Sequence, residues 1–243
     1  MRTGQICRKA LLALTLLGTL AGCGAPSGSS SSGESEGDLI LLTIGTADSG
    51  GTMYQAGSAL AQAITQEDHS IKVNISASTG SGMNVRSLES GEVDLALVSG
   101  DMAYAAVNGQ DEFQPPVELR AIGAVYSSVS NWVVPASSGY TYVHDLTGAR
   151  IGAGPQGSTT ELSARAAAAS LSLEEQGITF VNCSLGDGAE MLGKGELDAV
   201  HAFTGMPVPS LVALAKEMPC RLLLYTPDCL LYTSPSPRDR TRS

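Results

Sequence analysis

Aromatic and basic residues are scarce in this chain, and the two shortages exclude some classes of protein. Phe, Trp and Tyr make up 5% of the 243 residues, with a single tryptophan, Trp132. A platform of aromatic side chains that stack on nucleic-acid bases is therefore not expected. The 14 Lys and Arg are outnumbered by 24 Asp and Glu, which gives a net charge of −10. Nucleic-acid binding needs a basic face, so no nucleic-acid partner is predicted.

Cysteines with the spacing of a metal or redox site are also missing. The five cysteines form no C-x-x-C motif and no Cys/His cluster, so neither a metal site nor a redox site is predicted. Beyond the N-terminal region only Cys183, Cys220 and Cys229 remain. A disulfide between Cys183 and Cys220 is left open, because sequence alone cannot establish it.

The N-terminal region has the pattern of an export signal. Three basic residues precede an apolar run over residues 10–20, which is too short to span a bilayer. The run ends in L-A-G-C at residues 20–23. This resembles the bacterial lipobox, in which the cysteine is lipidated and becomes the first residue. Residues 1–22 are predicted to be a lipoprotein signal peptide with Cys23 as the lipid anchor. A plain secretory signal is the alternative.

A flexible tether is predicted to follow the signal peptide. Residues 23–38 are rich in Gly and Ser and contain acids, with nothing to pack into a core. Cleavage before Cys23 would remove three basic residues and no acid, which leaves a charge of −13. The mature protein is expected to be extracytoplasmic and lipid-anchored at the outer face of the bacterial membrane.

A strand, a glycine-rich loop and a helix are predicted over residues 39–64. Residues 39–44 have the composition of a strand buried on both faces, and residues 45–51 are too rich in Gly and Ser for a helix or strand. The helix is expected to begin with Thr52 as its N-cap, with Gln55 completing a capping box. The free N–H groups at such a helix end suit a bound anion. An ordinary turn without a ligand is the alternative.

Further elements alternate along the chain. Strands are predicted at residues 71–76, in a turn-and-strand segment at 91–98, and at 119–125 and 131–134; helices are predicted at 83–90 and at 102–108, the latter capped by Asp101. A second series follows, with a helical turn at 145–148, strands at 149–153 and 178–183, a helix at 188–192 and a turn into a strand at 195–200. Ser158 and Glu161 form a capping box that opens a helix through Ser170.

The order of the elements repeats. A strand followed by a glycine loop and a helix occurs at Gly45 and at Gly152. The pattern G-E-hydrophobic-D-hydrophobic follows 46 residues later at Gly91 and 43 residues later at Gly195. Two patterns in the same order at matched spacing predict two lobes of similar α/β build, with mainly parallel sheets and a ligand at the carboxyl ends of the strands. The acids of the repeated turns, Asp94 and Asp198, are expected to cap backbone groups.

Signatures of cofactor binding and catalysis are weak. G-x-G-x-x-G at residues 152–157 lacks the acid at the end of the following strand, and Pro155 removes an N–H from the loop. We treat this match as chance and expect no cofactor. No Walker A or G-x-S-x-G motif occurs, and His69, His144 and His201 lack a recognisable partner. His201 is expected at a strand end, in a cleft or on the surface.

Some single residues are candidates for contacts with a ligand. Arg86, Arg120 and Arg165 each have the chemistry to clamp a carboxylate, although a surface charge is the ordinary role of an arginine. Four aromatic residues are candidates for cleft walls, with core packing as the alternative for each: Tyr54, Tyr104, Trp132 and Phe203.

Taken together, the motifs resemble one family over residues 39–226. They are the run 45–57, Ser78-Thr79-Gly80-Ser81 with Asn84, Gly91–Asp94, the Ser99-Gly100-Asp101-x-Ala103-Tyr104 pattern, Asp145-Leu146-x-Gly148, Gly157-Ser158-x-Thr160-Glu161 and Gly205-x-Pro207. In this order they closely resemble the TAXI-type solute receptors of tripartite ATP-independent periplasmic (TRAP) transporters. The resemblance implies a two-lobed, type II periplasmic-binding-protein-like α/β fold with hinge strands between the lobes. It also implies a receptor without enzymatic activity.

The resemblance further implies a ligand and a partner. The receptor would close on a small organic acid or amino acid, such as glutamate or 2-oxoglutarate, and hand it to a TRAP membrane permease. The implied ligand-facing positions of lobe 1 are Thr46, Ser49, Gly50, Gly51, Thr52, Tyr54, Thr79, Ser81, Ser99 and Asp101. Those of lobe 2 and the hinge side are Gln156, Gly157, Ser158, Thr159, Phe203 and Thr204. No metal is expected. An ABC-type receptor and an exported enzyme on the same scaffold are the alternatives.

The C-terminal segment departs from this family pattern. From Cys229 the chain reads C-L-L-Y-T-S-P-S-P-R-D-R-T-R-S, without helical or strand periodicity. Residues 229–243 are expected to be a non-native read-through tail on a truncated receptor, with a real disordered basic tail as the alternative. The expected domains are lobe 1 over 39–130, incomplete, and lobe 2 with hinge strands over 131–228.

Overall fold

The computed structural model describes residues 39–226. The predictions for the signal peptide, the Cys23 anchor, the tether and the tail from residue 229 fall outside the described residues. Within them, no helix has the length and apolar character needed to cross a membrane.

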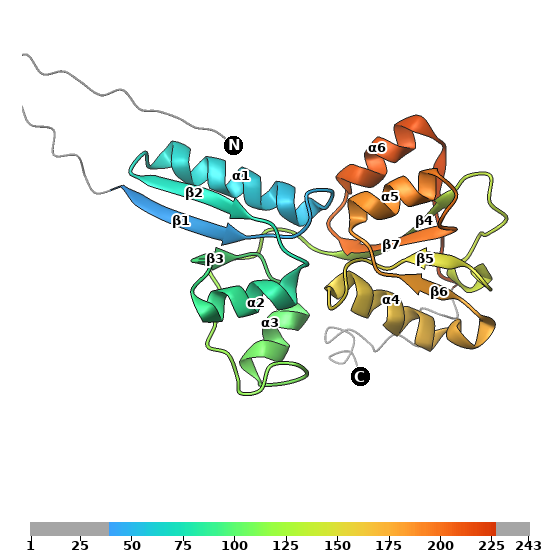
Figure 1. Cartoon of the computed structure of the whole chain (residues 1–243), viewed down its shortest axis with the longest axis horizontal. Coiled ribbons are helices and arrows are strands. Elements are labelled where there is room, and N and C mark those ends of the chain that lie inside the picture. The colour runs from blue at the N-terminus through green and yellow to red at the C-terminus, as the bar shows by residue number, and fades with distance from the viewer. Residues whose placement is uncertain (1–38, 227–243) are drawn as a thin grey trace, which may run out of the picture. The chain divides into compact units, whose positions relative to one another are not determined.

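The first part of the described chain forms a three-stranded parallel sheet, the N-terminal sheet (Figure 1). Its strands are β1 (Ile40–Gly45), β2 (Ile71–Ser76) and β3 (Leu95–Ala96), in the order β2-β1-β3. Helix α1 (Thr52–Glu67) packs on β1 and β2, whereas α2 (Ser81–Ser90) contacts β3 and α3 (Gly100–Val107). Each parallel connection runs through a helix, as the alternating sequence pattern predicts.

The second part forms a five-stranded mixed sheet, the C-terminal sheet. Its order is β6 (Thr179–Val181), β5 (Arg150–Gly152), β7 (Ala199–Thr204), β4 (Val129–Pro135) and β8 (Cys220–Leu222). Strands β5, β6 and β7 are parallel, whereas β4 pairs antiparallel with β7 and β8. The helices are α4 (Thr159–Ser170), α5 (Leu185–Gly193) and α6 (Pro209–Glu217), with short 3-10 turns at Val143–Asp145 and Glu174–Gln176.

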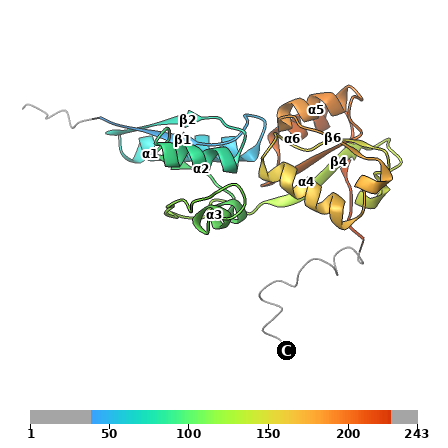
Figure 2. The ribbon, with the colours of Figure 1, turned by 60° about the horizontal axis from the view of Figure 1, so that its bottom comes forward.

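Alternating side chains divide the core around the C-terminal sheet into two clusters. Trp132 and Val134 of β4 pack with Ala164 and Ala168 of α4 on one face. Val133, between them in the strand, belongs to the cluster formed with α5 and α6 on the other face. This follows from the two-residue period of a strand. The views in Figures 1 and 2 accordingly show α4 and the α5–α6 pair on opposite sides of this sheet.

The repeated Gly-Glu turns have the same hydrogen bonds in both sheets. The Thr43 N–H of β1 donates to Asp94 Oδ2 at 2.8 Å, and the Arg150 N–H of β5 donates to Asp198 Oδ2 at the same distance. The turn glycines before these acids have φ of +75° and +72°, a region that favours glycine. The prediction that both acids cap backbone groups is confirmed.

Two predictions about strands were wrong. Strand β1 is not buried on both faces: Leu41 is 61% exposed and Ile44 is buried, and helix α1 packs mainly against the neighbouring strand β2. Residues 119–125 form no strand, and Ile122 is 86% exposed. A strand needs a hydrogen-bonded neighbour. The edge strand β3 of the N-terminal sheet is shorter than predicted, with only two paired residues, and offers little backbone for a further strand to pair with.

Two predicted helix caps were also wrong, and one was right. Helix α1 begins at Thr52, but its N-cap is Gly51 and there is no side-chain cap, because the Thr52 hydroxyl donates to another segment. Helix α3 has Ser99 as its N-cap, which places Asp101 inside the first turn. In α4 the Ser158 hydroxyl accepts from the Glu161 N–H at 3.1 Å, as predicted.

Candidate functional site

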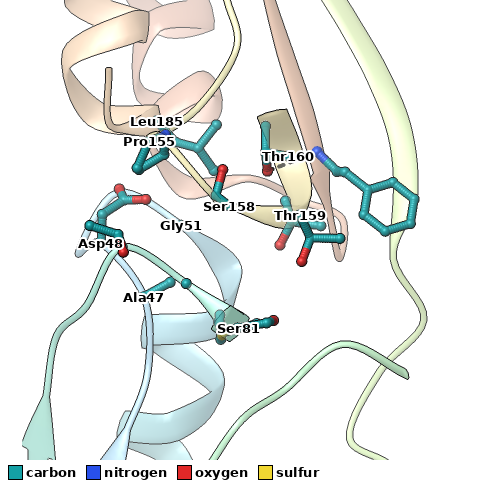
Figure 3. Close-up of a pocket in the computed structure, with 14 residues that line it drawn as sticks. Ala47, Asp48, Gly51, Ser81, Pro155, Ser158, Thr159, Thr160 and Leu185 are labelled. Carbon is teal, nitrogen blue, oxygen red and sulfur yellow. Dashed lines mark hydrogen bonds between the residues drawn. The ribbon is translucent and has the colours of Figure 1, made fainter. Parts of the chain in front are cut away.

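A small cavity lies where four helices begin. Its volume is about 50 Å³, enough for a few waters. Residues at or beside the N-termini of α1, α2, α4 and α5 form the wall, together with the end of β7 (Figure 3). The lining residues are Ala47, Asp48, Gly51, Met53, Thr79, Gly80, Ser81, Pro155, Ser158, Thr159, Thr160, Leu185, Phe203 and Thr204.

Hydrogen-bond donors converge on one side of this cavity. The first N–H groups of a helix have no acceptor within the helix, and they form its positive end. The N-termini of α2 and α4 lie next to each other there: a Cβ added to Gly80 would lie 3.5 Å from the Cβ of Ser158. Hydroxyl groups of Ser81, Ser158 and Thr159 surround them, and all three residues are buried. Such a wall suits a carboxylate.

A buried asparagine holds the loops that carry these residues. The Asn84 amide donates to the Thr46 carbonyl at 2.8 Å and to the Leu97 carbonyl at 2.8 Å. The Ser78 hydroxyl donates to the Thr46 carbonyl at 2.6 Å and contacts Asn84 Oδ1 at 2.7 Å. Asn84 therefore ties the loops after β1, β2 and β3 together at the carboxyl ends of the parallel strands.

Contacts between the two halves of the described chain surround the cavity. Ser99 Oγ and Thr159 Oγ1 are 2.9 Å apart, and the Thr52 hydroxyl lies 2.6 Å from the Gly205 carbonyl oxygen. Gly50 lies against Gly186, where an added Cβ would come within 2.7 Å of the Gly186 nitrogen. A side chain at position 50 would therefore force this contact open.

The structure brings part of the predicted site together. Seven predicted residues line the cavity: Gly51, Thr79, Ser81, Ser158, Thr159, Phe203 and Thr204. Gly50, Thr52 and Ser99 lie in the contacts just described. The Thr46 hydroxyl is buried and donates to the Ser76 carbonyl at 3.0 Å. The others are not in the wall: Ser49 lines a neighbouring hollow, Tyr54 is half-buried, and Asp101, Gln156 and Gly157 are exposed.

Sequence reasoning missed Asp48, which is the charged member of the wall (Figure 3). Burial raises the pKa of the Asp48 carboxyl, and hydrogen bonds from the backbone N–H groups of Gly50, Leu185 and Gly186 offset this only in part. The Gly50 N–H lies 3.1 Å from Asp48 Oδ1. The sequence pointed to Asp48 only through its position in the glycine-rich loop at residues 45–51, which is expected to face a ligand.

His201 lies inside β7 and is fully buried, so its expected place at a strand end was wrong. Its Nε2 is 3.0 Å from Ser130 Oγ, and its ring packs against Trp132 with centroids 4.5 Å apart. Burial lowers the pKa of His201 from 6.5 to about 3, which keeps the ring neutral. Strand β7 is buried along almost its whole length, which places His201 in the core, and the partner of its Nε2 is the Ser130 hydroxyl rather than an acid.

The candidate arginines lie away from the cavity. Arg86 pairs with Glu112 at 2.7 Å and Arg165 with Glu161 at 2.9 Å, while Arg120 is exposed. Among the aromatic candidates, Phe203 lines the cavity, Trp132 is in the core and Tyr104 is exposed. Cys183 and Cys220 are free thiols in the structure, so the disulfide left open by the sequence is not formed.

Residues 44–230 match the model of the NMT1-like family. The chain belongs to the NMT1-like family. Members of periplasmic receptor families resemble it in structure. An ancestral arginine-binding protein bound to arginine matches with 17% identity and a TM-score of 0.54, over 77% of this chain and 80% of that chain.

Two further solved structures agree with this likeness. The substrate-binding protein of an amino acid ABC transporter matches with 15% identity and a TM-score of 0.54, over 76% of this chain and 78% of that one. Lactococcal OpuAC, closed and complexed with glycine betaine, matches with 14% identity and a TM-score of 0.53, over 76% and 70%. The predicted fold class is confirmed: this NMT1-like chain has the two-lobed α/β fold of type II periplasmic binding proteins.

Proposed function

We propose that this NMT1-like protein is an extracytoplasmic solute receptor for a small organic acid or amino acid. The observation that supports this most strongly is the cavity at the N-termini of α1, α2, α4 and α5. A ligand carboxylate would accept hydrogen bonds from the N–H groups at the starts of α2 and α4 and from the surrounding hydroxyls. Membership of a family with a receptor fold favours this role over an enzymatic one.

The predicted site residues divide into two roles under this proposal. Those in the wall would contact the ligand. Gly50, Thr52 and Ser99 would join the lobes when they close on it, since they already contact the other half of the chain. A ligand that binds the closed state more tightly would shift the equilibrium towards closure. The lobes would correspond to residues 39–130 and 131–228, joined by hinge strands.

The transporter that the receptor serves is proposed to be of the TRAP type, with the protein as its TAXI-family subunit. The ordered glycine and hydroxyl motifs support this proposal. The lipid anchor at Cys23 would hold the receptor beside the permease on the outer face of the membrane. An ABC transporter is the second candidate, because one similar structure is the binding protein of an amino acid ABC transporter. Uptake that stops with an uncoupler while ATP persists would support TRAP. Uptake that follows ATP would support ABC.

Titration calorimetry with amino acids, dicarboxylates and 2-oxo acids would test receptor function. Ala47 lies in the cavity wall (Figure 3), and Ala47→Phe is expected to fill the cavity and abolish the binding heat. Ala63→Phe is the matched control, because Ala63 is exposed on α1, and it should bind as the wild type does. No heat with any compound in the wild-type protein would contradict the proposal. Unchanged binding in Ala47→Phe would place the ligand elsewhere.

A further inference from the structure

The cavity wall contains a negatively charged side chain and no positively charged one. Of the 14 lining residues, Asp48 alone is ionisable near neutral pH, and the wall contains no Lys, Arg or His. The remaining polar groups are neutral hydroxyls and backbone amides. A site built for a dicarboxylate or an oxo acid would not place a carboxylate without a cationic partner in its wall, because like charges repel strongly where water is partly excluded.

Among residues 39–226 no Lys or Arg forms an ion pair with Asp48. The ion pairs formed among residues 39–226 use other carboxylates, including Glu112, Glu161 and Asp198. The charged neighbour of Asp48 across the contact with α5 is Asp187, a second acid. Its hydrogen bonds come from backbone N–H groups, of which that of Gly50 is 3.1 Å away. Burial of the carboxylate is therefore only partly compensated within the protein.

The two charged ends of an amino acid match the two sides of this wall. Asp48 lies beside the start of α5, since it accepts hydrogen bonds from Leu185 and Gly186. The donor groups at the starts of α2 and α4 form a separate part of the wall, at Gly80, Ser81 and Ser158. One part offers hydrogen bonds to an anion and the other offers a negative charge to a cation.

We infer that the ligand is a zwitterion, an amino acid whose ammonium group pairs with Asp48 while its carboxylate lies at the starts of α2 and α4. The inference rests on the proposed receptor function and narrows it, because dicarboxylates and 2-oxo acids lack the ammonium group. Asp48 is thereby a specificity-determining residue. Replacing the Asp48 carboxylate with a neutral amide removes the partner of the ammonium group. The donor groups at the starts of α2 and α4 are left unchanged.

Calorimetry with pairs of L-amino acids and their 2-oxo acids, such as L-glutamate and 2-oxoglutarate, tests the inference. The wild-type protein should bind one amino acid at least about tenfold more tightly than its oxo acid, since a hydrogen bond to a charged group commonly contributes that much. Asp48→Asn should reduce amino-acid affinity about tenfold or more and bring the ratio close to one. Asp187→Asn is the matched control. It removes the same charge from an exposed residue that does not line the cavity, and it should change affinity less than about threefold.

The outcomes separate this inference from the proposed function. An oxo acid or dicarboxylate that binds the wild type as tightly as any amino acid would overturn the zwitterion and leave the receptor intact. If Asp48→Asn and Asp187→Asn lost amino-acid affinity equally, the direct contact between Asp48 and the ammonium group would be overturned. The effect would then come from the overall negative charge of this region. Absence of binding by every probe would contradict the receptor function itself. A melting temperature of Asp48→Asn at or above that of the wild type would show that lost binding is not lost folding.

Discussion

At the scale of single residues, the hydrogen-bonded side chains around His201 show that a polar group can be buried for a structural reason and not for ligand binding. Trp132 Nε1 donates to Tyr225 Oη at 2.7 Å, Tyr225 Oη is 3.0 Å from Ser130 Oγ, and Ser130 Oγ is 3.0 Å from His201 Nε2. The four side chains join β4, β7 and the segment after β8 inside the core. Because these hydrogen bonds satisfy Trp132 Nε1, Ser130 Oγ and His201 Nε2 within the chain, these atoms need no ligand to account for them.

The neutral His201 makes stability depend on pH in a predictable direction. The folded-state pKa of about 3 lies below the ordinary value of 6.5, so only the unfolded chain takes up a proton between these values. The free energy of unfolding contributed by this residue is therefore intact above pH 6.5 and falls as the pH drops, by up to about 1.4 kcal/mol per pH unit. Denaturant titrations at pH 7, 6 and 5, followed by Trp132 fluorescence, should show this slope.

The variant His201→Gln should lose that part of the pH dependence, because glutamine does not titrate and can still contact Ser130. His69→Gln serves as the control: His69 is exposed in the turn after α1, where its Nδ1 lies 3.0 Å from the Thr65 carbonyl oxygen. It should retain the wild-type slope. Identical slopes for His201→Gln and the wild type would contradict the buried neutral imidazole.

At the scale of elements, the sequence predicted best where the signal was local. The Ser158 N-cap of α4 and the strand β2 follow from neighbouring residues, and both predictions were correct, although the Glu161 side chain accepts from the Gly157 N–H and so does not close the capping box. The run 119–125 has strand composition but forms no strand, because strand formation depends on a partner far away in the sequence. The Thr52 hydroxyl likewise does not cap its own helix but donates to the carbonyl of Gly205, 153 residues away in the sequence.

The repeated Gly-Glu turns allow a matched test of one element in two sheets. Asp94 accepts a single hydrogen bond across its turn, from Thr43, whereas Asp198 also binds the Arg150 guanidinium at 3.1 Å. Asp94→Ala is expected to cost about 1 kcal/mol of unfolding free energy and Asp198→Ala slightly more, because the second also loses a solvent-exposed ion pair, which contributes little. Urea unfolding followed by circular dichroism measures both. Glu118→Ala, an exposed control, should stay within about 0.5 kcal/mol. If both aspartate variants matched that control, the turns would not stabilise the sheets.

At the scale of the whole molecule, seven of the residues that the sequence analysis expected to face a ligand line the cavity, which is half of its 14 lining residues. The internal repeat places the starts of α1 and α4 at equivalent positions, and both contribute to the cavity wall. The repeat carries no information on how the two halves meet. Thr160 and Leu185 of the wall were missed for that reason, whereas Gln156 and Gly157, which were expected to face a ligand, are exposed and lie outside the wall.

The Thr52 contact predicts how closure and affinity are coupled. Its hydroxyl lies 2.6 Å from the Gly205 carbonyl oxygen and 3.2 Å from that of Pro207, joining the start of α1 to the segment after β7. Thr52→Val keeps the shape and removes the donor, so the closed state should lose about 1 kcal/mol, or about fivefold in ligand affinity. Small-angle scattering should show a larger radius of gyration for Thr52→Val before ligand is added. Thr52→Ser should restore both values, and Thr65→Val on the same helix should change neither. Unchanged affinity and radius in Thr52→Val would mean that this hydrogen bond does not hold the lobes together.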